Sequence, residues 1–85
     1  MKPNMIALIE FLGMQRTMTG ADSIEVPITK KSRVDDVLEY IRDKYPQLQL
    51  DEGMVLVTVN QEIAPRDRVL KPGDAISFLP FISGG

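Results

Sequence analysis

The stretch Ser32-Arg-Val-Asp-Asp-Val-Leu-Glu-Tyr-Ile-Arg-Asp-Lys-Tyr-Pro46 carries the period of an amphipathic helix in this 85-residue sequence. Its apolar positions follow one another at spacings that place them on one helical face. Ser32, with Asp35 three residues later, predicts an N-cap, and Pro46 ends the helix because it cannot continue one. About twelve residues, or roughly 18 Å of helix, match the length of one short strand. The pattern predicts one helix packed across one sheet by a stripe of Val34, Val37, Leu38, Ile41 and Tyr45.

Two strands are predicted before this helix. Residues 5–11 are apolar at both alternating sets of positions, which is typical of a strand inside a sheet. Gly13 ends this strand, and residues 14–20 are predicted to form a loop. Residues 22–28 form the second predicted strand, with Ile24, Val26 and Ile28 on one face. Pro27 has no backbone donor, so this strand is expected at an edge of the sheet.

Three more strand segments follow the helix. Residues 54–59 are rich in β-branched residues, and residues 62–64 are short enough to pair back as a hairpin arm. Asn60 tolerates the left-handed backbone that a tight turn between them requires. Lys71-Pro-Gly-Asp74 predicts a turn. Residues 75–80 form the last predicted strand, with Ile76 and Phe78 facing the core.

The order strand, strand, helix, strand, short strand, strand predicts an α+β domain of two layers. The first and last strands have the most apolar residues on both faces, so they are expected to be neighbours at the sheet centre. This is the β-grasp arrangement, a mixed sheet of four to five strands with one main helix on one face. We expect residues 1–85 to form a single domain, with residues 81–85 as a flexible C-terminal Gly-Gly tail.

The composition argues against several kinds of function. The chain has no Cys and no His, so it lacks thiolate chemistry, sulfur ligands for metals and the commonest general base. We therefore expect neither a metal site nor independent catalysis. The net charge of −2 gives no basic footprint for nucleic acid. No apolar run approaches the roughly 18 residues of a membrane span, and no signal peptide is recognisable, so a cytoplasmic protein without membrane contact is expected.

The sequence ends in Leu79-Pro80-Phe81-Ile82-Ser83-Gly84-Gly85. Residues 81–85 span roughly 16–18 Å when extended, enough to enter a deep active-site channel. Gly84 and Gly85 have no Cβ, which lets their backbone approach a nucleotide or a thiolate closely. These properties predict that the domain presents this segment to other molecules.

Three segments together resemble the MoaD/ThiS sulfur-carrier family of ubiquitin-like β-grasp proteins. They are Val57-Thr-Val-Asn-Gln-Glu-Ile63, Leu70-Lys-Pro-Gly-Asp-Ala-Ile-Ser-Phe-Leu-Pro80 and Ser83-Gly84-Gly85. The similarity extends over the chain from Met5 onward. The ending Phe78-Leu-Pro-Phe-Ile-Ser-Gly-Gly85 is closest to the small, sulfur-carrier subunit of molybdopterin synthase.

The resemblance implies a carrier without catalytic side chains or a bound cofactor of its own. A partner, an adenylyltransferase of the ubiquitin-activating type, would use ATP to adenylate the carboxylate of Gly85. A sulfur donor of the desulfurase or rhodanese type would convert the adenylate to a thiocarboxylate. The large subunit of molybdopterin synthase, or another sulfur acceptor, would then receive the sulfur.

A docking surface is expected beside the tail, on the face of the sheet that the helix leaves uncovered. The residues expected there, or at the end of this face, are apolar: Phe11, Ile63, Leu79 and Phe81. The tail residues Pro80, Ile82, Ser83, Gly84 and Gly85 are expected to bind the same partners. Exposed contiguous apolar surface commonly marks an interface, and the family that the chain resembles binds its partners through this face.

Two alternatives use the same terminal carboxylate. The chain could be a protein modifier that is joined through Gly85 to lysines of its targets by an isopeptide bond. It could also carry sulfur for thiamine, cysteine or another thio-metabolite. The sequence leaves these possibilities open.

Overall fold

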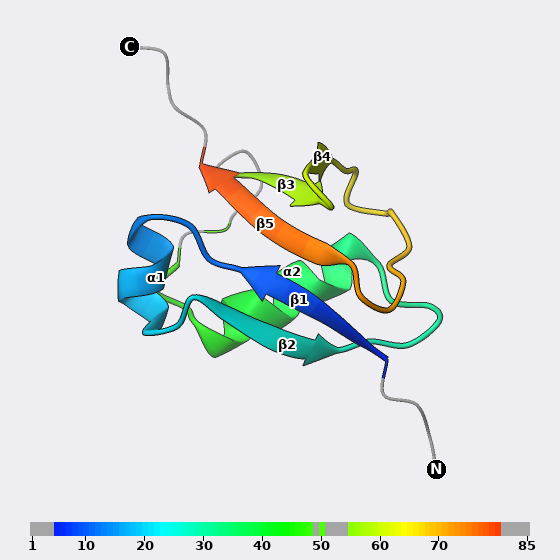
Figure 1. Ribbon diagram of the computed structural model, residues 1–85, viewed down its shortest axis with the longest axis horizontal. Coiled ribbons are helices and arrows are strands. Elements are labelled where there is room, and N and C mark those ends of the chain that lie inside the picture. Colours follow the sequence, from blue (N-terminus) through cyan, green and yellow to red (C-terminus); the bar gives the residue numbers. More distant parts are fainter. Residues whose placement is uncertain (1–4, 49, 51–54, 81–85) are drawn as a thin grey trace.

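The computed structural model describes residues 5–48, 50 and 55–80 of the chain. Within them lie five strands and two helices (Figure 1). In chain order they are β1 Ile6–Glu10, α1 Met14–Thr19, β2 Ser23–Pro27, α2 Val34–Lys44, β3 Val55–Val59, β4 Glu62–Ile63 and β5 Ala75–Pro80.

The strands form one mixed sheet in the order β2-β1-β5-β3-β4. β1 and β5 are parallel, and the other neighbouring pairs are antiparallel. The prediction that the first and last strands are adjacent in the sheet is confirmed, with β5 at its centre. β2 lies at one edge, as Pro27 predicted, because an edge strand needs only half of its backbone donors.

The α2 helix packs against one face of the sheet (Figure 1). Its predicted apolar stripe is buried, except that Tyr45 is only partly covered. The sheet contributes the alternate residues of its strands to the same core, including Ala7, Ile9, Ile76 and Phe78, each 0% exposed. The two-layer β-grasp arrangement expected from the sequence is therefore confirmed.

The start of α2 differs by one residue from the prediction. Arg33 is the N-cap, and the Asp36 carboxylate accepts a hydrogen bond from the Arg33 N–H at 2.9 Å. The predicted cap, Ser32, accepts instead from the Thr29 N–H at 2.9 Å and so closes the preceding turn. The predicted pairing of Ser32 with Asp35 is wrong. Asp35 lies three residues after Ser32, and Asp36 lies three residues after Arg33, so the capping spacing fits both pairs. Tertiary contacts select the second pair.

The prediction of a loop over residues 14–20 is also wrong, since Met14–Thr19 forms α1. The helix is bounded by two glycines with positive φ, Gly13 at 53° and Gly20 at 74°, a conformation that favours glycine. None of its six residues is fully buried. A helix without a buried stripe has no 3.6-residue apolar pattern, so this one left no periodic signal in the sequence.

The predicted hairpin arm is confirmed, and Asn60 and Gln61 form its turn with φ of 52° and 71°. The Asn60 side chain donates to the buried Asp74 carboxylate at 3.0 Å and accepts from the Ala75 N–H at 3.0 Å. Asp74 also accepts from the Lys71 N–H at 2.8 Å. This network joins the turn to the start of β5 and helps to hold β5 in register.

Candidate functional site

The predicted tail, residues 81–85, follows β5 directly in the sequence, so the end of β5 is the described part of the chain nearest to it in sequence. β5 lies between β1 and β3, and its pairing with β3 continues to the pair Val55 and Pro80. The last described residue, Pro80, therefore belongs to the central strand of the sheet rather than to an edge strand. The predicted tail residues Phe81, Ile82, Ser83, Gly84 and Gly85 lie outside the described residues.

We call the sheet surface opposite α2 the open face. On this face the strand register places Leu79 beside Leu56. It also places Thr58 between Ser77 on one side and Ile63 on the other. Leu79 is 36% exposed and Ile63 is 68% exposed. The structure thus brings these two predicted docking residues to one face, with Leu79 directly before the end of β5.

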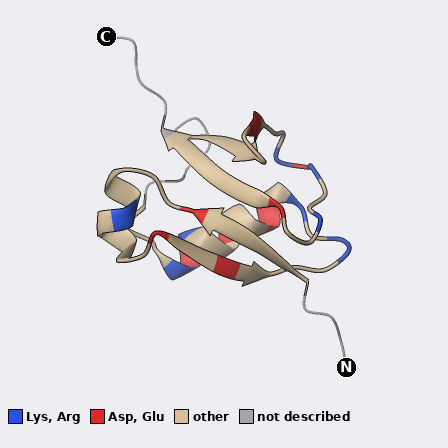
Figure 2. Cartoon of the chain, in the orientation of Figure 1, with Lys and Arg blue, Asp and Glu red and all other residues tan. Residues whose placement is uncertain are grey.

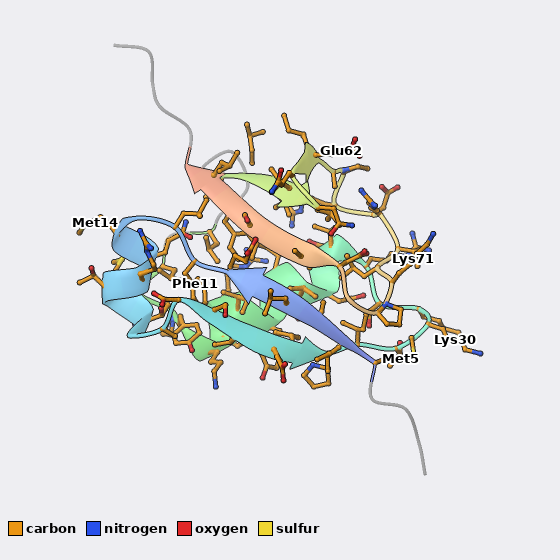
Figure 3. The ribbon with its side chains drawn as sticks, in the orientation of Figure 1. Met5, Phe11, Met14, Lys30, Glu62 and Lys71 are labelled. Carbon is orange, nitrogen blue, oxygen red and sulfur yellow. The ribbon has the colours of Figure 1, made fainter. Side chains whose placement is uncertain are left out.

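Phe11 does not belong to the open face, and its predicted docking role is wrong in this respect. Its side chain is 2% exposed and packs edge-on against Tyr45, with ring centroids 5.5 Å apart. Phe11 lies where β1 ends, beside α1 (Figure 3). It alternates in step with the buried Ala7 and Ile9, so its side chain points toward the α2 layer.

Other residues that the sequence reasoning did not single out occupy the open face. Ile6 and Leu8 of β1 and Leu56 of β3 are only half-buried there. Their signal was present in the sequence as the second apolar set of each strand. A strand that is apolar on both sides inside a two-layer fold leaves one of these sets for another molecule to cover.

Acidic residues flank the open face toward β2. Glu10 pairs with Ser23 and Ser77, and Glu25 pairs with Leu8, so both carboxylates lie on this face, and both residues are exposed. Figure 2 shows acidic residues on β1 and β2, and basic residues in the loops near the start of β5. The face therefore combines apolar residues of β1, β3, β4 and β5 with acidic residues of β1 and β2, which suits a partner surface with apolar and basic residues.

The described part of the chain offers no centre for metal chemistry. Residues 5–48, 50 and 55–80 contain no group of three or more metal-ligating side chains. They also contain no helix long and apolar enough to cross a membrane. The described residues form instead a partly apolar open face beside the end of a central strand.

A mixed five-stranded sheet that holds one long helix, with its last strand at the centre and an apolar face beside the strand end, defines a ubiquitin-like β-grasp protein. A sequence model of the ThiS family matches residues 9–85. The chain belongs to the ThiS family.

Relatives and solved structures agree with this assignment. The molybdopterin synthase sulfur carrier subunit of Mycobacterium tuberculosis is 36% identical over 72% of this chain and 74% of its own length. The protein of the same name from Haemophilus influenzae is 32% identical over 88% of this chain and 94% of its own. The crystal structure of small archaeal modifier protein 1 from Haloferax volcanii superposes with a TM-score of 0.79 over 92% of this chain and 99% of its own. At 16% identity this last similarity supports the fold alone.

Proposed function

We propose that this chain is a sulfur carrier for the synthesis of molybdopterin, the organic part of the molybdenum or tungsten cofactor. Its reactive group is the carboxylate of Gly85. The observation that carries the proposal is the family match, which reaches residue 85 and so includes Gly84-Gly85. The names of the two bacterial relatives support molybdopterin as the pathway.

The proposed reaction takes place at the chain terminus inside partner enzymes. The Gly85 carboxylate displaces pyrophosphate from ATP to give an acyl-adenylate. The persulfide sulfur of a donor then attacks the adenylate and releases AMP, and a thiol cleaves the S–S bond of the resulting acyl disulfide, which leaves the thiocarboxylate and a new disulfide. The chain needs no cofactor of its own in this scheme, and ATP binds to the activating partner.

Three kinds of partner follow from this scheme. They are an adenylyltransferase of the ubiquitin-activating type, a desulfurase or rhodanese as donor, and the large subunit of molybdopterin synthase as acceptor. The open face supports docking of such partners because two apolar residues are exposed on it: Leu79, directly before the end of β5, and Ile63, on β4 at the level of Ser77. These reactions belong to the cytoplasm.

Intact-mass measurement tests the proposal directly. The purified chain is incubated with its activating enzyme, ATP and a sulfur donor, and we expect the mass gain of one oxygen replaced by sulfur. Chains lengthened by one residue after Gly85, or lacking Gly85, serve as controls and should show no such gain. Normal thiocarboxylate formation on these controls would contradict the proposal, as would an unchanged carboxylate on the natural chain.

The same measurement separates the carrier from the protein modifier. Protein isolated from its native host would be analysed for the thiocarboxylate and for Gly-Gly remnants on lysines of other proteins. A carrier gives the first product. Gly-Gly remnants on lysines, found without any thiocarboxylate, would contradict the carrier function and favour the protein modifier.

A further inference from the structure

The side chain of Gln15, in the first turn of α1, connects two distant backbone groups. Its Oε1 accepts a hydrogen bond from the Leu12 N–H at 3.0 Å. Its Nε2 donates to the Phe78 carbonyl oxygen at 2.9 Å, across 63 positions of sequence. Gln15 is half-buried, whereas its neighbours Met14 and Arg16 are exposed. One carboxamide therefore joins the end of β1 to the end of β5.

These two bonds take the place of a missing ladder contact. The Leu8 N–H donates to the Asp74 carbonyl at 2.9 Å, and the parallel pairing of β1 with β5 ends at Glu10 and Ser77. Leu12 and Phe78 lie four residues beyond Leu8 and Asp74, so continued pairing would join their N–H and carbonyl groups directly. Gly13, with its positive φ, begins the turn into α1 instead.

A primary carboxamide has the acceptor and the donor of a peptide group. Inserted between Leu12 and Phe78, it satisfies both backbone groups after the two strands have separated. An unpaired carbonyl at a partly buried strand end would otherwise lose the stabilisation of its hydrogen bond. Gln15 thus extends the β1–β5 ladder by one side chain.

The position of this contact gives it a consequence for the tail. Phe78 lies two residues before Pro80, the last residue of β5. β3 holds the other side of β5 as far as Pro80, through the pair with Val55. The end of β5 is therefore fixed on both sides, by the β3 backbone and by the Gln15 carboxamide.

We infer that Gln15 is a positioning residue of the carrier, which fixes the direction in which the chain leaves the sheet after Pro80. This inference rests on the proposed function, because a fixed direction matters only if residues 81–85 must reach a reaction centre in a partner. In this role Gln15 acts through the β5 backbone, to which its side chain is hydrogen-bonded at Phe78.

The inference predicts a particular kinetic change. The open face would set the affinity of the docked complex, and the strand end would set the fraction of docked complexes in which Gly85 reaches the nucleotide. Loosening of the strand end should therefore lower kcat and leave KM nearly unchanged. A variant that is merely less folded has a smaller active concentration, which raises the apparent KM and leaves kcat intact.

Gln47 offers a matched control. Its Nε2 donates to the Met18 carbonyl oxygen at 2.9 Å, so it also holds α1, but among the described residues its side chain forms no hydrogen bond with β5. Substitution of either glutamine by Met keeps an unbranched chain of similar length and removes the hydrogen bonds. Gln15→Glu adds a finer comparison, because a carboxylate can accept from the Leu12 N–H but cannot donate to the Phe78 carbonyl.

The experiment is a steady-state assay of thiocarboxylate formation with the activating enzyme, ATP and a sulfur donor, over a range of carrier concentrations. For Gln15→Met and Gln15→Glu we expect kcat to fall by about threefold to tenfold, since small misplacements of reacting groups are costly. KM should stay within about twofold. Gln47→Met should match the natural chain. Amide hydrogen exchange should become faster at Phe78 and Leu79 in both Gln15 variants, with Leu12 still protected in Gln15→Glu.

Unchanged kcat in both Gln15 variants would overturn the inference, and so would an equal loss in Gln47→Met. A rise in KM with unchanged kcat would reduce Gln15 to a purely structural residue. If Gln15→Met is unfolded at the assay temperature, Gln15→Glu decides by the same criteria. Failure of the natural chain to form a thiocarboxylate would instead contradict the proposed function, so the two failures are distinguishable.

Discussion

Phe11 and Leu8 show how much depends on the orientation of a single side chain. Both are apolar residues of the first strand segment, but Phe11 is buried against Tyr45 and Leu8 lies half-buried on the open face. The sequence placed them correctly on opposite faces through alternation. The expectation that Phe11 is exposed on the face that the helix leaves uncovered was wrong, because alternation does not indicate which face a helix will cover.

Replacement of Phe11 by Ala should destabilise the protein by about 3–5 kcal/mol, the usual cost of removing a buried aromatic side chain. The cavity would lie between the end of β1 and Tyr45, where the rings now meet edge to face. Guanidinium unfolding monitored by circular dichroism measures this loss. Leu12→Ala, at a position 38% exposed, should change stability by less than about 1 kcal/mol. Equal stability of Phe11→Ala and the natural chain would contradict the buried position.

Asp74 is a buried polar residue whose carboxylate accepts from Asn60 and from the Lys71 N–H. Asp74→Ala should cost about 2–3 kcal/mol, because it leaves donors at the start of β5 without their acceptor. Thermal unfolding provides the measurement. Asp67→Ala, at an exposed loop position, should stay within about 0.5 kcal/mol of the natural chain. Comparable losses in both variants would show that charge, rather than the buried network, is responsible.

At the scale of elements, the two helices differ in how strongly the sequence encodes them. α2 has a buried stripe of four residues and bounds that agree with the prediction at both ends to within a residue or two. α1 has no buried residue and depends on two glycines and on the Gln15 contacts. Short helices without an apolar stripe are stabilised by tertiary contacts rather than by propensity.

The cap of α2 gives a prediction at this scale. Asp36→Ala removes the acceptor of the Arg33 N–H and should destabilise the protein by about 1 kcal/mol, as cap substitutions commonly do. Asp43→Ala, at an exposed position near the other end of the same helix, removes an acid from the negative end of the helix dipole and should be neutral or slightly stabilising. Urea unfolding of the pair measures the difference. A greater loss in Asp43→Ala would contradict the assigned cap.

At the scale of the whole molecule, the helix layer and the sheet layer have different roles. α2 covers one face of the sheet and supplies the core, while the open face and the end of β5 remain available for partners. Both faces are built from the same strands. Because β5 is the central strand, its position fixes where the strand end lies relative to the open face.

Substitution on the open face should weaken partner binding without unfolding the domain. Ile63→Ala and Leu79→Ala should each reduce affinity for the activating enzyme by about 5–30-fold, since exposed apolar side chains at an interface core carry much of the binding energy. Titration calorimetry with the purified enzyme measures this effect. Tyr40→Ala is the control, because Tyr40 is 41% exposed on the outer side of α2. A loss of affinity in Tyr40→Ala alone would place the interface on the helix layer.

The sequence by itself determined the order of the five strands and α2, the edge position of β2, the tight turns and the stripe of α2. These features depend on residues within a few positions of one another, through alternation, helical period and the backbone preferences of Gly, Asn and Pro. The resemblance of its motifs also identified the family correctly. The alternation of β1 further indicated which of its residues share a face.

The tertiary structure alone decided which face of β1 is covered, that residues 14–19 form a helix, which acid caps α2, and that Gln15 continues the sheet to Phe78. Each of these depends on contacts between segments far apart in the chain, such as β1 with α2 or α1 with β5. Local patterns carry no information about such contacts, because the free energy of burial and of the Gln15 hydrogen bonds exists only once the layers have assembled.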